Sequence, residues 1–162
     1  MRCLFILTVF FLGLATHALA DDSYQETVKK AEVMAQKIID GCWAISEEDR
    51  SGPPVSVGSG TMNSALCMRD HINDLARTVL FKKQPDKQKE IAETLDKIID
   101  DTGGFYGNLY TAHDVCAKQD CGSMWVAMPN DDVAKTMEKI VRDFYRQLAE
   151  WDSDYGFITS TP

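Results

Sequence analysis

The sequence predicts an all-α protein, built as a disulfide-stapled bundle of about four helices. Apolar residues recur every three or four positions along most of the chain, which is the period of a helix that buries one face. No stretch alternates apolar and polar residues as a half-buried strand does. An even number of cysteines follows residue 20, which suits a pair of disulfides in an exported chain.

The first twenty residues have the pattern of a secretory signal peptide. Arg2 gives a positive start, residues 4–15 form an apolar run, and Ala18-Leu19-Ala20 is a small-x-small cleavage site. The alternative, an uncleaved membrane anchor, would need a longer apolar run. We therefore expect cleavage after Ala20, a periplasmic or secreted protein that is free of the membrane, and a single helical domain over residues 21–162.

The charge of the chain argues against two classes of partner. The formal net charge is −8, and it becomes −9 when the signal peptide removes Arg2. Such a chain repels nucleic acid and anionic membrane surfaces. It suits a basic protein partner or simple solubility.

The first helix of the mature chain is expected from Tyr24. Its apolar positions alternate in steps of four and three: Tyr24, Val28, Ala31, Ala35, Ile38, Cys42 and Ile45. Gly52, Pro53 and Pro54 end any helix by that point.

Residues 51–60, SGPPVSVGSG, are expected to form a loop whose ends a bridge between Cys42 and Cys67 would hold. The prolines would stiffen the loop, which lowers the entropy lost on binding. As a recognition surface, it would bind through Pro53, Pro54, Val55, Ser56 and Val57. The alternative is a plain connection, which is the commoner use of a loop.

The second helix is expected to start near Thr61 and to end at residues 82–85. Its buried stripe would be Ala65, Met68, Ile72, Leu75 and Val79. Cys67 lies at the edge of this stripe, and an edge position favours a bridge to a neighbouring helix.

The third helix is expected over residues 86–115, although it contains Gly103-Gly104. The spacing continues through the glycines without a change of phase, along Ile91, Leu95, Ile98, Thr102, Phe105, Leu109, Ala112 and Cys116. The glycine pair costs about 2 kcal/mol relative to alanine, so packing has to hold this helix together.

Residues 116–130 are expected to form a compact corner, in which Ser123 and Trp125 are further candidates for binding a partner. Asn130 or Asp131 can cap the last helix. The buried stripe of that helix would be Val133, Met137, Ile140, Phe144, Leu148 and Trp151. The remaining tail has no helical period and is expected to be loose from about residue 152.

Three pairings are possible for the cysteines of the mature chain, Cys42, Cys67, Cys116 and Cys121. We prefer Cys42–Cys67 and Cys116–Cys121, since each bridge then joins the nearest partners along the chain. The cysteine spacings are not those of a zinc site. We therefore expect no metal and no cofactor.

The sequence contains no GxSxG, HExxH, P-loop or Rossmann glycine pattern. Only Asp70, His71 and Asp74 gather residue types that catalyse reactions. Asp70 and His71 are adjacent on a helix and point in different directions, whereas His71 and Asp74 are expected to form a solvated surface pair. We therefore expect no catalytic residues and no enzyme activity.

Two segments resemble the LprI-type lysozyme-inhibitor family of small exported helical proteins. Residues 61–67, TMNSALC, with Asp70 and Asn73 after them, resemble the family's "MN…C…D..LN" segment. Residues 110–116, YTAHDVC, with Gly122-Ser123-Met124 after them, resemble its "C…GS(I/M)" segment. The chain departs from the pattern at Cys121, which precedes the Gly-Ser pair, and it lacks an arginine before Cys116.

The resemblance implies a protein that binds and blocks lysozyme. Lysozymes are strongly basic, so an acidic chain would be attracted to one over a distance. Two other functions remain open: a periplasmic immunity protein that neutralises a cell-wall-degrading toxin such as an amidase, and a structural subunit of an envelope assembly.

Overall fold

The computed structural model describes residues 2–47, 51, 53–112 and 124–160, and every element in this part of the chain is helical. The predicted all-α bundle is therefore confirmed. The elements are α1 (Arg2–Ile45), α3 (Pro54–Leu75), the π-helical turn η1 (Ala76–Leu80), α4 (Pro85–Ala112), α5 (Met124–Glu150), α6 (Asp152–Tyr155) and α7 (Phe157–Ser160).

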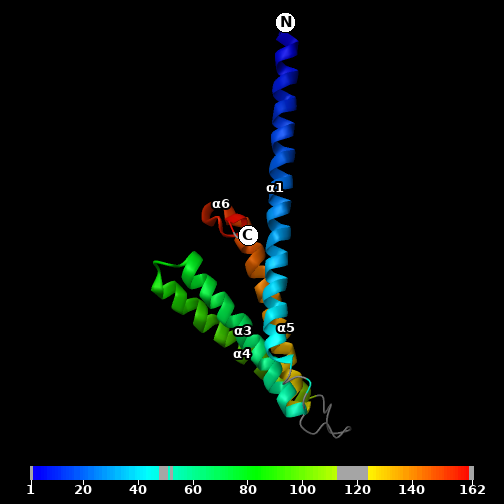
Figure 1. Cartoon of the computed structure of the whole chain (residues 1–162), viewed down its shortest axis with the longest axis vertical. Coiled ribbons are helices and arrows are strands. Elements are labelled where there is room, and N and C mark those ends of the chain that lie inside the picture. Colours follow the sequence, from blue (N-terminus) through cyan, green and yellow to red (C-terminus); the bar gives the residue numbers. More distant parts are fainter. Residues whose placement is uncertain (1, 48–50, 52, 113–123, 161–162) are drawn as a thin grey trace.

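Helix α5 is the centre of the bundle and contacts α1, α3 and α4 (Figure 1). α3 runs parallel to α5, whereas α1 and α4 run antiparallel to it. The first part of α1 extends beyond the other helices (Figure 1). Within the described residues, no helix carries an apolar stretch of the length needed to cross a membrane. Cleavage after Ala20 stays a prediction.

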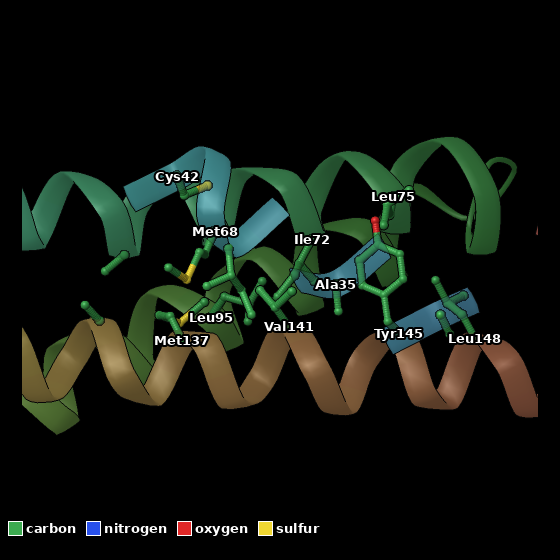
Figure 2. Packing of buried hydrophobic residues seen from close by; sticks show 14 of the residues in the cluster. Ala35, Cys42, Met68, Ile72, Leu75, Leu95, Met137, Val141, Tyr145 and Leu148 are labelled. Carbon is green, nitrogen blue, oxygen red and sulfur yellow. The ribbon is translucent and has the colours of Figure 1, made fainter. Parts of the chain in front are cut away.

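The core lies where α1, α3, α4 and α5 face one another (Figure 2). α1 contributes the small residues Ala31 and Ala35, which are completely buried and let its backbone pack against its neighbours. Larger side chains fill the space between α3, α4 and α5, and Figure 2 shows Met68, Ile72, Leu95, Met137, Val141 and Leu148 among them. Most positions of the predicted stripes are thus buried or half-buried.

The start of α3 corrects the expected loop at residues 51–60. Pro53 is the N-cap and Pro54 the first helical residue, a position where a missing N–H costs nothing. The hydroxyl of Thr61 donates to the carbonyl oxygens of Val57 and Gly58, at 3.1 and 3.0 Å. The helix therefore begins before Thr61, and the glycine-rich segment is its first two turns.

Helix α4 continues through Gly103-Gly104, as its spacing predicts. A Cβ atom at Gly103 would lie 3.5 Å from Val133 Cγ2, an ordinary contact, and one at Gly104 would meet nothing within 4 Å. Close packing therefore requires neither glycine. The predicted stripe is wrong at Phe105, which is 61% exposed, because the buried face is rotated towards Ile99.

Helix α5 begins at Met124, so residues 124–130 belong to a helix and not to the expected corner. Pro129 lies inside this helix near its start. The predicted stripe is wrong at Trp151, which is 42% exposed. Tyr145 is 2% exposed instead, because α5 has neighbours on several sides and buries a wider face than one stripe.

The C-terminal tail is also ordered, contrary to expectation. Asp152 is buried, and its carboxylate accepts hydrogen bonds from the backbone N–H groups of Ile158 and Thr159. Gly156 has a φ of +62°, a left-handed conformation that turns the chain between α6 and α7. Ile158 is completely buried in the core. The tail is thus held by a polar contact and an apolar anchor.

Candidate protein-binding end of the bundle

The long helices meet at one end, where α1 and α4 finish and α3 and α5 begin (Figure 1). We call this the loop end and define it as residues 41–47, 53–61, 105–112 and 124–132. It gathers residues that are far apart in the sequence. It also contains most of the positions that sequence reasoning selected for binding.

A disulfide holds α1 to α3 at the loop end. Cys42 and Cys67 are bridged, with their Cα atoms 5.6 Å apart, so the preferred pairing is confirmed for these two cysteines. A buried hydrogen bond between the hydroxyls of Ser46 and Ser64 lies one turn further along. Cys116 and Cys121 lie outside the described residues, and their bridge stays a prediction.

A hydrogen bond joins the two predicted binding segments. The side-chain amide of Asn130 on α5 donates to the carbonyl oxygen of Gly58 on α3, at 2.8 Å. Pro53 is exposed and Val57 is half-buried beside this contact. The side chains of residues 54–56 and of Trp125, and the whole of Ser123, lie outside the described part of the chain. The start of α3 and the start of α5, the two candidate segments, are therefore in contact at the loop end.

Two exposed apolar residues at the loop end were missed by sequence reasoning. Ile45, at the end of α1, is 74% exposed, and Phe105 on α4 is 61% exposed. Both were assigned to buried stripes. For Ile45 the available signal was its place as the last position of its stripe. Phe105 lies inside its stripe, and its only signal was that it directly follows the glycine pair. Large exposed apolar side chains are candidate contacts for a partner.

Aromatic residues extend from Phe105 along α4. Phe105 and Tyr106 pack edge to face, with their ring centroids 5.2 Å apart. The hydroxyl of Tyr110 donates to the carboxylate of Asp132 on α5 at 2.5 Å, and this hydrogen bond raises the pKa of Tyr110 to about 12. Tyr110 therefore stays protonated at neutral pH and ties α4 to the start of α5.

The loop end is acidic. The four ranges that define it contain Glu47, Asp131 and Asp132, and they contain no lysine or arginine. Asp131 forms an ion pair with Lys135 one turn later, at 2.5 Å. The charged side chains within these four ranges are therefore all acidic, and Lys135 beyond them pairs with one of them.

The environment of His71 differs from the solvated surface that the sequence predicts for it. His71 is half-buried, and its Nε2 lies 2.7 Å from the hydroxyl of Tyr145 on α5. Burial lowers the pKa of His71, and the charge of Asp74 opposes this effect. The expected solvated pair with Asp74 is therefore wrong, because His71 faces α5.

The two acidic neighbours of His71 point elsewhere. Asp70 accepts hydrogen bonds from Arg69, which also reaches Asp96 on α4 at 2.9 Å. Asp74 pairs with Arg77 on its own helix. These carboxylates take part in surface ion pairs, whereas His71 takes part in the contact between α3 and α5.

No group of three or more His, Cys, Asp or Glu side chains that could hold a metal ion occurs among the described residues. The expectation of a protein without cofactor or catalytic activity stays a prediction. Comparison with protein-family models, curated proteins and solved structures finds no match to this chain.

Proposed function

We propose that this protein is an exported binding protein that inhibits a basic cell-wall hydrolase of the lysozyme type by covering its cleft with the loop end. The observation that carries the proposal is the Asn130–Gly58 contact, which brings two separately selected segments to one surface. The likeness of residues 61–67 and 110–116 to the LprI-type family supplies the class of partner.

The chemistry of the loop end supports this choice of partner. Ile45 and Phe105 offer exposed apolar side chains, and aromatic residues such as phenylalanine are enriched in the cores of protein interfaces. The carboxylates in the four ranges of the loop end would attract a basic protein and increase the rate of association. The Cys42–Cys67 bridge limits the motion of α3 relative to α1, so less entropy is lost on binding.

The test measures how the purified protein slows the lysis of a bacterial cell-wall suspension by lysozyme. We expect inhibition that weakens as salt is added, because the attraction between exposed charges is screened. Ile45→Ala and Phe105→Ala should each raise the inhibition constant by about tenfold, which corresponds to about 1.4 kcal/mol. Both side chains are exposed, so the fold should survive each change.

Val33→Ala is the matched control, since Val33 is 68% exposed but lies on α1 away from the loop end. It should leave the inhibition constant within about twofold. If the wild-type protein leaves lysozyme fully active, this partner is wrong. Retention of an amidase-type toxin on a column carrying the protein would then favour an immunity function.

A further inference from the structure

A hollow lies between α1 and α5 on a different part of the surface from the loop end. Its volume is about 690 Å³, and it is lined by Lys29, Glu32, Val33 and Gln36 from α1 and by Arg142 and Arg146 from α5. These residues face one another because α1 and α5 run side by side in opposite directions (Figure 1). Their spacing of three and four residues places each set on one face of its helix.

The hollow is positively charged on an acidic protein. Three of its lining side chains are cationic and one, Glu32, is anionic, and the carboxylate of Asp143 lies beside Arg146, whereas the chain has a formal net charge of −8. Charges of exposed groups are screened over about 10 Å at 0.1 M salt. A ligand in the hollow would therefore respond mainly to these nearby cations and not to the carboxylates on α4.

The two arginines have few strong partners among the described residues. Arg142 donates one hydrogen bond, at 2.8 Å, to the neutral side-chain oxygen of Gln36, and it forms no ion pair with a described carboxylate. Arg146 lies 3.7 Å from the carboxylates of both Glu32 and Asp143, which is longer than a hydrogen bond. Guanidinium donors are thus available to a ligand.

We infer that this hollow binds a phosphate group. Guanidinium groups match the geometry of phosphate oxygens and bind them through paired hydrogen bonds, and a lysine adds a mobile positive charge. Arg142 and Arg146 are one helical turn apart, where like charges repel each other, and an anionic phosphate group between them would relieve that repulsion. The exposed side chain of Val33 would contact the organic part of a phosphate ester.

This inference is independent of the proposed function, because it concerns another surface. The phosphate has two possible sources with the same chemistry: a small soluble phosphate compound or the headgroup of an anionic phospholipid. The experiment therefore needs one arm for each source, with the same variants in both.

The first arm follows backbone amide NMR shifts of the purified protein while inorganic phosphate is added. We expect saturable shifts around residues 29–36 and 142–146. Arg142→Gln should weaken binding by at least about tenfold, or about 1.4 kcal/mol. Glu32→Gln should tighten binding, because it removes the anion that competes for Arg146.

Lys139→Gln is the matched control. Lys139 is an exposed cation on α5 outside the hollow, and its loss changes the net charge by the same amount as loss of Arg142. The control should bind phosphate within about twofold of the wild type. Equal weakening by Arg142→Gln and Lys139→Gln would overturn the inference, since it would mean that only the overall charge matters.

The second arm measures sedimentation with vesicles of phosphatidylglycerol, compared with vesicles of phosphatidylcholine. Binding to the anionic vesicles alone, with loss in Arg142→Gln, would assign the site to a lipid headgroup. Absence of binding in both arms would overturn the site. If Arg142→Gln proved unstable in a thermal melt, Glu32→Gln would still decide, because unchanged or weaker binding by that variant contradicts the proposal.

Discussion

The start of α3 and the C-terminal tail look alike in the sequence, since both have weak apolar periodicity and contain glycine and serine. Both become helical in the folded chain. The start of α3 is held from a distance, by Asn130, which lies 72 residues from Gly58. The polar contact that holds the tail is local, since Asp152 caps Ile158 only six residues later, and the side chain of Ile158 then packs into the core. A segment of irregular composition can thus be ordered by a remote contact or by its own polar residue.

The two contacts differ in strength for a physical reason. The contact to Gly58 is a hydrogen bond between neutral groups in a half-buried place. The contact at Asp152 involves a carboxylate that is only 6% exposed and accepts two backbone N–H groups. Hydrogen bonds to a charged group are about twice as strong as neutral ones. Substitutions should therefore separate the two regions.

The largest effect is expected from removal of the disulfide that holds α3 to α1. Replacement of Cys42 and Cys67 together by alanine should lower the free energy of unfolding by about 3 kcal/mol. The bridge closes a loop and so reduces the conformational entropy of the unfolded chain, and this restriction is lost in the variant. Urea unfolding followed by circular dichroism would measure this loss. A decrease below about 1 kcal/mol would mean that α3 docks without help from the bridge.

The next effect concerns the tail. Asp152→Ala should lower the free energy of unfolding by about 2 kcal/mol, because the buried N–H of Ile158 and the half-buried N–H of Thr159 lose their acceptor. Asp154→Ala, in the same helical turn but exposed, is the control and should change stability by less than about 0.5 kcal/mol. Equal losses in both variants would show that the capping contact contributes nothing specific.

A smaller effect is expected at the start of α3. Asn130→Ala should lower the free energy of unfolding by about 1 kcal/mol, since it removes one neutral hydrogen bond. Asn63→Ala serves as the control because Asn63 is exposed on α3. A loss in Asn130→Ala as large as that in Asp152→Ala would contradict the difference between the two regions.

The smallest effect comes from pH, through the His71–Tyr145 contact that lies between the two regions along α5. Burial lowers the pKa of His71 below its ordinary value of 6.5, so the unfolded chain takes up a proton first as the pH falls. Stability should therefore decrease as the pH falls from about 6.5 to the pKa of the folded state, and should not decrease further below it. Burial raises the pKa of Tyr145 to about 12, so its hydroxyl does not titrate in this range.

His71→Gln isolates this contribution. The difference in unfolding free energy between the wild type and this variant should depend on pH only within that window. A difference that stays constant across the window would show that His71 has the same proton affinity in the folded and unfolded chains.

Helical periodicity was enough to predict the class of fold and much of the core. Helical periodicity assigned Ala35, Met68, Ile72, Met137 and Leu148 to buried faces, and all of them are buried. These assignments succeed because periodicity depends only on the geometry of a single helix. The Cys42–Cys67 pairing also followed from the chain itself, since the two cysteines are only 25 residues apart.

Which side of each stripe is buried, and which distant residues meet, depends on how the helices pack against one another. Ile45, Phe105 and Trp151 continue their stripes but are exposed, because exposure depends on which neighbouring helices reach that level of the bundle. The same holds for the contact between Asn130 and Gly58. Nothing in the sequence around either residue indicates that the two are in contact. The contact depends on the parallel packing of α3 and α5, which local sequence patterns do not encode.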